Sequence, residues 1–156
     1  MAIQQEEKVR TILAVDYGRK RIGLALSDEL GLTARPLAVL ERTNRKNTLR
    51  LLRELFRKHH VGLIVVGYPL HLTGEAGEMA DEASRFAVRL SKELGVRVEL
   101  LDERLTTWQA NQTVSATGSP SRRGKPLDDV AAAVLLQEYL DRAADGPRLV
   151  PQRKVR

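Results

Sequence analysis

The sequence predicts an α/β domain with a mixed five-stranded sheet, in which a three-strand antiparallel meander joins parallel strands and helices flank the sheet. Strand-like and helix-like patterns alternate along the chain in the order β-β-β-α-β-α-β-α-α. Several of the strand-like runs are apolar on both faces, as is typical of central strands in a covered sheet. A chain of 156 residues, 42% of them hydrophobic, can bury one such core but not two substantial ones.

The first three strand-like runs predict the meander. Residues 11–18, "TILAVDYG", are apolar on both faces and suit the centre of the sheet. Residues 21–28 and 34–42 also favour β-structure, and only the short stretch "ELGLT" separates them. Such short connections are typical of antiparallel neighbours, so we expect the three runs to pair in chain order.

At residue 44 the apolar period changes to that of a helix. Residues 44–60 carry an apolar stripe and, on another face, three arginines. The stripe consists of Leu49, Leu52, Leu55 and Phe56, and the arginines are Arg50, Arg53 and Arg57. A basic amphipathic helix is therefore expected, followed by a buried strand over residues 61–69.

The second half of the chain repeats this alternation. Residues 78–95 predict a long helix that Gly95 ends, and residues 96–103 predict a third core strand. A capping box formed by Thr106 and Gln109 predicts a helix over 107–117. The expected loop 118–126 and the final helix 127–143 complete the elements. We expect one domain over 1–142, with 143–156 as a basic, flexible tail.

Composition favours a polyanionic partner. The chain has 26 Lys and Arg against 20 Asp and Glu, a formal net charge of +6, which suits nucleic acid. The absence of cysteine excludes a disulfide scaffold and thiolate metal sites. No apolar run approaches the roughly 20 residues of a membrane span, and the N-terminus lacks an apolar signal segment, so a cytoplasmic protein is expected.

Carboxylates stand where the predicted sheet would place a site. Asp16 ends one core strand, Glu103 ends another, and Asp128 and Asp129 open the last helix. Sites in such sheets gather at the carboxyl ends of the parallel strands. Converging carboxylates repel one another unless a cation neutralises them, and hard oxygen ligands suit one or two Mg²⁺ or Mn²⁺ ions. Two ions about 4 Å apart can activate water and stabilise the leaving oxygen of a phosphodiester.

Basic residues flank these carboxylates. Arg19, Lys20 and Arg21 follow the first one, where they could contact phosphate oxygens or simply form a charged hairpin edge. Arg104 follows Glu103 and either contacts nucleic acid or forms a solvated ion pair with that glutamate. A further basic cluster lies in the loop before the last helix and favours phosphate binding. It consists of Arg122, Arg123 and Lys125.

Four stretches resemble the signature blocks of the YqgF/RuvX family, in that family's order and spacing: "AVDYGRKRIGLALSD", "IVVGYPLHLTGEAGE", "LLDERLTT" and "LDDVAAAVLLQEYL". The resemblance runs from about Ile12 to Leu140. It implies an RNase H-like fold and a metal-dependent nuclease for structured nucleic acid, with 5′-end processing of precursor 16S rRNA favoured over Holliday junction resolution. It also implies that Asp16, Glu103 and Asp128 are the catalytic and metal-binding residues.

The chain departs from this family at Asp129, where a polar uncharged residue is usual. Helical geometry allows Asp128 or Asp129 to face inward, because both have alanines three and four residues on. Two other functions fit the pattern. A non-catalytic nucleic-acid-binding module could keep the same fold. An actin- or hexokinase-type phosphate binder also opens with a strand, Asp-x-Gly and a hairpin, but it needs two lobes, and this chain supplies one.

Overall fold

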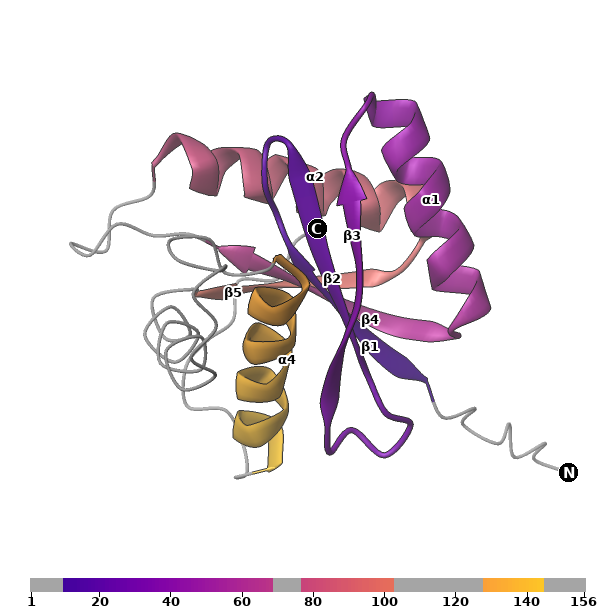
Figure 1. The fold of residues 1–156 in the computed structure, drawn as a ribbon, viewed down its shortest axis with the longest axis vertical. Coiled ribbons are helices and arrows are strands. Elements are labelled where there is room, and N and C mark those ends of the chain that lie inside the picture. The colour runs from indigo at the N-terminus through magenta and orange to yellow at the C-terminus, as the bar shows by residue number, and fades with distance from the viewer. Residues whose placement is uncertain (1–9, 69–76, 103–127, 145–156) are drawn as a thin grey trace, which may run out of the picture.

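The computed structural model describes residues 10–68, 77–102 and 128–144. Five strands form one sheet in the order β3-β2-β1-β4-β5, as Figure 1 shows. The strands are β1 (Thr11–Asp16), β2 (Arg21–Ser27), β3 (Ala34–Glu41), β4 (Val61–Tyr68) and β5 (Arg97–Asp102). The described helices are α1 (Arg45–Lys58), α2 (Glu78–Leu94) and α4 (Asp128–Ala144). The mixed five-stranded sheet predicted from the sequence is thereby confirmed.

The pairing directions bring three strand ends together. β1 pairs antiparallel with β2, and β2 with β3, whereas β1 pairs parallel with β4, and β4 with β5. In this register Val15 lies opposite Val66, and Tyr68 lies opposite Asp102. The end of the sheet at which β1, β4 and β5 terminate is called the carboxyl end below, and Asp16 lies there.

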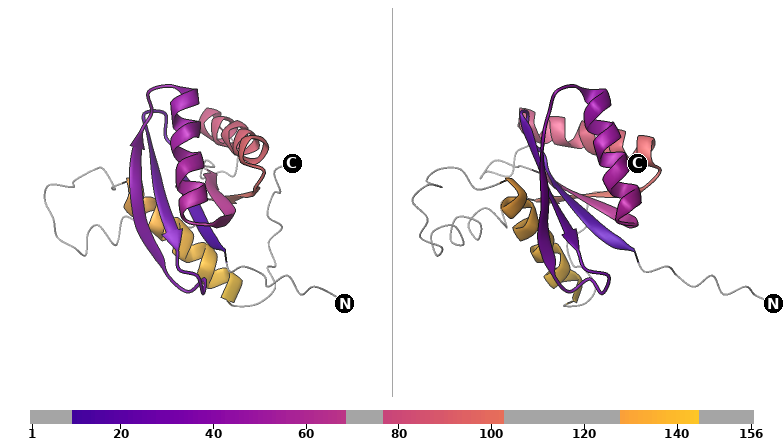
Figure 2. Two further views of the ribbon diagram at one scale, coloured as in Figure 1. Left: turned by 90° about the vertical axis from the view of Figure 1, so that its right-hand side faces the viewer. Right: turned by 45° about the vertical axis from the view of Figure 1, so that its right-hand side comes forward.

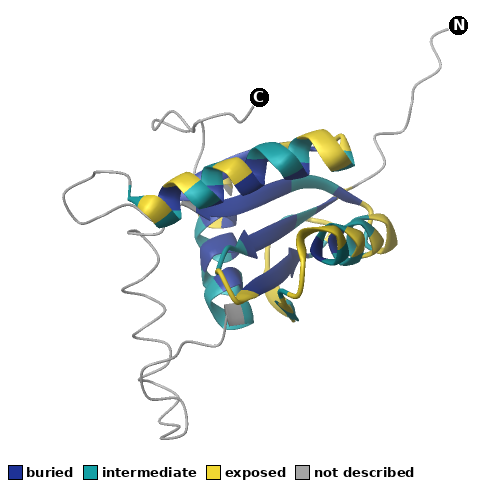
Figure 3. Cartoon of the chain, turned by 90° about the horizontal axis from the view of Figure 1, so that it is seen from above, coloured by how far each residue is buried: buried dark blue, intermediate teal, exposed yellow. Residues whose placement is uncertain are grey.

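Helices cover both faces of the sheet. α1 and α2 lie on one face and α4 on the other, as the side views in Figure 2 show. Leu13 and Val15 of β1 belong to the core beneath α1 and α2, whereas Ala14 belongs to the core beneath α4. This alternation is the pleat of the strand. β1 and β2 are largely buried between the two helical layers, whereas the edge strand β3 is partly exposed (Figure 3).

The side chain of Gln137 fixes the direction of α4 across the sheet. Its Nε2 donates to the carbonyl oxygen of Leu32 (3.1 Å), and its Oε1 accepts from the N–H of Ala34 (3.0 Å). Both partners lie at the β2–β3 turn, beyond the amino end of β1. Asp128 precedes Gln137 by nine residues, so at about 1.5 Å per residue α4 begins roughly 13 Å nearer the carboxyl end.

The helix bounds differ slightly from the expected ones. α1 ends at Lys58 because His60 takes a left-handed conformation with φ of 52°, a common way to end a helix. Gly95 ends α2 in the same conformation, as predicted. α4 continues to Ala144, two residues past the expected domain limit, and the rest of the predicted tail lies outside the described residues. The expected helix 107–117 and loop 118–126 also lie outside them.

The longest helices found, α2 and α4, have 17 residues each. Among the described residues no helix combines the length and the apolar character that a membrane crossing requires.

Candidate active site

Asp16 is a half-buried residue at the carboxyl end of the sheet. It follows Ala14 by two positions, and strand alternation therefore puts it on the face that α4 covers. Its partner in β2 is Gly23, which has no side chain to cover that position. Asp16 thus lies on the same face of the sheet as the helix that opens with the other candidate aspartates.

The turn after Asp16 requires glycine at position 18. A Cβ atom there would overlap the carbonyl oxygen of Arg21, so no other residue allows this close approach without a backbone shift. The tight connection leads β1 directly into β2 and leaves Arg19, Lys20 and Arg21 exposed beside the strand end. The sequence order Asp-Tyr-Gly-basic therefore produces a carboxylate and an exposed basic turn at the same end of the sheet.

The other predicted ligands are described only in part. Asp128 is the first residue of α4, but its side chain is not among the described ones. One carboxylate oxygen of the half-buried Asp129 accepts a hydrogen bond from the N–H of Val130 (2.9 Å). Glu103 directly follows β5 and lies outside the described residues. No group of three His, Asp or Glu residues that could hold a metal occurs within 10–68, 77–102 and 128–144.

A second carboxylate, Glu99 of β5, is buried on the α4 side and was missed by the sequence analysis. It is 3% exposed, and its Oε2 accepts from the hydroxyl of Tyr139 in α4 (2.8 Å). Its Oε1 lies 2.8 Å from Nη2 of Arg97. Glu99 therefore links α4 to β5, the strand that leads to Glu103. The available signal was an acid flanked by the apolar residues Val98 and Leu100 in the middle of a strand.

The basic turn is already partly paired. Arg19 donates to both carboxylate oxygens of Glu82 in α2, at 2.9 to 3.1 Å, and lies 3.5 Å from Glu78. The hydrogen bonds and charge of Glu82 raise the pKa of the Arg19 guanidinium, and Arg19 holds the pKa of Glu82 below its ordinary range. A phosphate at Arg19 would have to compete with these glutamates. The predicted contacts at Arg104, Arg122, Arg123 and Lys125 lie outside the described residues.

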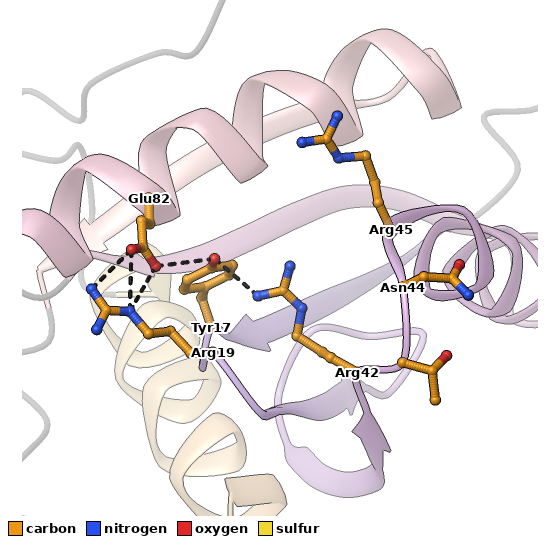
Figure 4. A pocket seen from close by; sticks show the side chains of 7 residues that line it. Tyr17, Arg19, Arg42, Asn44, Arg45 and Glu82 are labelled. Atoms are coloured by element: carbon orange, nitrogen blue, oxygen red, sulfur yellow. Dashed lines mark hydrogen bonds and ion pairs between the residues drawn. The ribbon is translucent and has the colours of Figure 1, made fainter.

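A polar surface hollow adjoins this turn on the face covered by α1 and α2. It is lined by Tyr17, Arg19, Arg42, Thr43, Asn44, Arg45 and Glu82 (Figure 4). The guanidinium of half-buried Arg42 lies 5.0 Å from the ring centre of Tyr17 and 5.9 Å from that of Phe86. It also donates to the Tyr17 hydroxyl (2.9 Å) and to the Gly18 carbonyl (3.1 Å). These four contacts fix the orientation of its planar group.

This hollow was not predicted from the sequence. The signal that could have drawn attention to it is a pair of arginines around a helix cap, in the order Arg42, Thr43, Asn44, Arg45. Asn44 does cap α1, because its side chain accepts from the N–H of Asn47 (2.8 Å). Only the tertiary structure shows that these arginines lie beside Tyr17 and Glu82.

Comparison with known proteins gives a consistent picture. A relative from Syntrophus aciditrophicus is 45% identical over 131 residues, which cover 83% of this chain and 87% of the relative. One from Carboxydothermus hydrogenoformans is 42% identical over 131 residues, covering 83% and 95%. Both relatives bear the provisional name pre-16S rRNA nuclease.

Two solved structures have a similar fold. RuvC from T. thermophilus in complex with a Holliday junction substrate matches with a TM-score of 0.54 and 17% identity, over 88% of this chain and 96% of that one. The Fowlpox virus resolvase in complex with Holliday junction DNA matches with a TM-score of 0.52 and 15% identity, over 84% and 97%. These matches confirm the predicted RNase H-like fold.

The family model described as Holliday junction resolvase, RuvX, matches residues 10–142. This range contains every described strand and almost all of α4, and it agrees with the resemblance carried by the four sequence blocks. The chain therefore belongs to the RuvX family.

Proposed function

We propose that this chain is a metal-dependent nuclease that hydrolyses phosphodiester bonds of structured nucleic acid in the cytoplasm, with the 5′ end of precursor 16S rRNA as its substrate. The observation that carries the proposal is the position of Asp16. It stands at the carboxyl end of β1, on the face covered by α4, in a chain whose relatives bear a nuclease name. Ligand sites of open α/β sheets occur at this end.

The donor chemistry fits a hard divalent cation. In our proposal Asp16, Glu103 and Asp128 hold one or two Mg²⁺ or Mn²⁺ ions through carboxylate oxygens, which these ions prefer. Glu103 comes two residues after Leu101 in the sequence, and Leu101 of β5 packs on the α4 side. When bound, the cation would lower the pKa of a coordinated water and offset charge on the phosphate.

The chain's own residues have supporting roles in this proposal. Asp16 and the first turn of α4 orient the cation, and the bond between Tyr139 and Glu99 holds α4 against β5. Lys20 and Arg21 are exposed beside Asp16 and would hold the strand by its phosphates. The three basic loop residues Arg122, Arg123 and Lys125 would add to this grip, and so would Arg104.

Two observations favour a second candidate, a resolvase that cuts four-way DNA junctions. The matching family model carries that description, and two structural neighbours were solved with junction DNA. Purified protein should therefore be incubated in parallel with a precursor 16S rRNA fragment that retains its 5′ leader and with a four-way DNA junction. Each incubation is run with Mg²⁺, with Mn²⁺ and with EDTA.

The proposal expects cleavage of the RNA with either metal and none in EDTA. Asp16→Asn keeps the shape and hydrogen-bonding capacity of the side chain but removes its charge. We expect it to lower cleavage at least about a hundredfold, because removing even an indirect support of a metal ligand costs 10 to 100-fold. Cleavage of the junction alone would assign the resolvase activity instead. Binding without metal-stimulated cleavage of either probe would identify a non-catalytic module.

A further inference from the structure

The hollow between β1, α1 and α2 lies on the face opposite to Asp16. Tyr17 packs against the core beneath α1 and α2, whereas Asp16, one residue earlier, faces α4. Both residues lie at the carboxyl end of the sheet. A ligand in the hollow and a ligand at Asp16 would therefore lie on opposite faces of the sheet, but both at the end of β1. One nucleic acid molecule could reach both positions.

The charges of the hollow favour an anion. Three arginines line it, against one glutamate, Glu82. Arg19 neutralises that glutamate with two hydrogen-bonding nitrogens, and the Tyr17 hydroxyl contacts its Oε2 at 3.4 Å. Within the described part of the chain, neither Arg42 nor Arg45 forms an ion pair with a carboxylate. Among the residues that the structure describes, no acid thus offsets the positive charge of Arg42 and Arg45.

We infer that this hollow binds a backbone phosphate of the nucleic acid that the enzyme cleaves, with Arg42 and Arg45 as the binding residues. The inference rests on the proposed nuclease function and extends it to a second contact on the other face of the sheet. Arg42 supplies a planar set of donors, which suits phosphate oxygens, and two aromatic rings hold it in place. Little side-chain entropy remains to be lost when it binds.

The start of α1 adds to this preference. Its first turn contains no acidic residue, although the positive end of a helix dipole favours acids there. Arg45 and Lys46 occupy these positions instead, and an anion close by would offset this unfavourable arrangement. The Thr43 hydroxyl accepts from Asn47 Nδ2 (3.1 Å) and can still donate its own proton to a phosphate oxygen.

The test uses a pair of charge reversals on the same helix. Arg45→Glu changes a residue of the hollow, and Arg57→Glu makes the same change on an exposed residue at the far end of α1, roughly 18 Å away. Glutamate in the first turn suits the helix dipole, so Arg45→Glu should fold with an unchanged or higher Tm. The probe is a fluorescein-labelled RNA hairpin with a single-stranded extension, bound in EDTA and followed by anisotropy over a series of salt concentrations.

We expect Arg45→Glu to weaken RNA binding about tenfold and to lower the slope of log affinity against log salt by roughly 0.7 to 0.9, the value for one lost phosphate contact. Arg57→Glu should change the affinity much less and leave the slope unaltered. Equal effects of the two variants would overturn the inference. A second result would also overturn it: inorganic phosphate alone raises the Tm of the wild type but not that of Arg45→Glu, while the two proteins bind RNA with the same affinity. The hollow would then be a site for free phosphate.

This experiment is separate from the test of cleavage, because EDTA removes the proposed cation. If Arg45→Glu selectively loses RNA binding and the wild type does not cleave in Mg²⁺, the phosphate site in the hollow is supported and the proposed nuclease function is rejected. If the wild type cleaves in Mg²⁺ and the two variants bind RNA equally well, the nuclease function is supported and the phosphate site in the hollow is rejected.

Discussion

At the scale of single residues, either Asp128 or Asp129 could be the third carboxylate ligand of the proposed metal site. A carboxylate oxygen of Asp129 accepts a hydrogen bond from the N–H of Val130, and the helix dipole stabilises an acid in the first turn, so Asp129 has a structural role available. We therefore expect Asp128→Asn to lower cleavage of the precursor rRNA at least about a hundredfold, and Asp129→Asn to lower it less than about tenfold. Measured kcat/KM values decide this, and the reverse ranking would assign the third ligand to Asp129.

The Arg19–Glu82 pair predicts a pH dependence. Arg19 lowers the pKa of Glu82 from its ordinary value of 4.5, so between the two values the folded chain binds fewer protons than the unfolded one. The stability from this pair is present above pH 4.5 and is lost as the pH falls through the lowered pKa. We expect Glu82→Gln to have a lower Tm than the wild type at neutral pH, and the two to converge on acidification.

Differential scanning calorimetry from neutral pH to about pH 3 measures this convergence. Glu54→Gln is the matched control, because Glu54 also pairs with an arginine but both side chains are 62% exposed. Exposed pairs contribute little to stability, so its Tm should stay close to that of the wild type. A constant Tm difference for Glu82→Gln at every pH would show that the substitution acts through packing rather than through charge.

At the scale of elements, the contact between Tyr139 and Glu99 determines how α4 sits on β5. The bond is buried, and Glu99 is a carboxylate inside the core. Removing the hydroxyl would leave one of its oxygens with one partner fewer, at a cost of about 1 to 3 kcal/mol. We expect Tyr139→Phe to lower the free energy of unfolding by that amount in urea.

Tyr17→Phe makes the same chemical change where the hydroxyl is only half-buried and bonds to Arg42 and Glu82. It should cost less than about 1 kcal/mol, because water can replace those contacts. If both variants lose the same free energy of unfolding, the buried hydrogen bond of Tyr139 stabilises the fold no more than the half-buried one of Tyr17.

The elements themselves could be predicted because each carries its own signal. Buried runs identify β1 and β4, the change of period at residue 44 identifies α1, and Gly95 identifies the end of α2. The end of α1 was less visible, since His60 adopts φ of 52° without being glycine. The position of Asp16 at a strand end followed from the same local signal.

The hollow could not be predicted in this way. Its lining comes from three separate stretches of the chain, and the pairing of Arg19 with Glu82 joins residues 63 positions apart. Glu99 posed a similar problem, because its partner Tyr139 is 40 positions away. No local hydrophobic period indicates such pairs, because their members come together only in the tertiary structure.

At the scale of the whole molecule, the sheet divides two kinds of surface that meet at its carboxyl end. Asp16 and α4 lie on one face, and the hollow of Arg42 and Arg45 lies on the other. The exposed turn 19–21 lies between them. A nucleic acid that passes over this end would meet the basic groups of the turn and of the hollow beside Asp16, which is consistent with the net charge of +6.

This arrangement predicts a strong dependence of nucleic acid binding on salt. Each phosphate neutralised by a cation releases counterions, which adds about 0.9 to the slope of log affinity against log salt for a duplex and about 0.7 for a single strand. We expect Lys20→Gln, in the exposed turn beside Asp16, to lower the slope by one such step. Lys92→Gln is the matched control, because Lys92 is also exposed but lies in the last turn of α2, whereas Glu78 and Glu82 near the hollow lie at its start. A wild-type affinity that is indifferent to salt, or equal slopes for the two variants, would contradict binding across the carboxyl end.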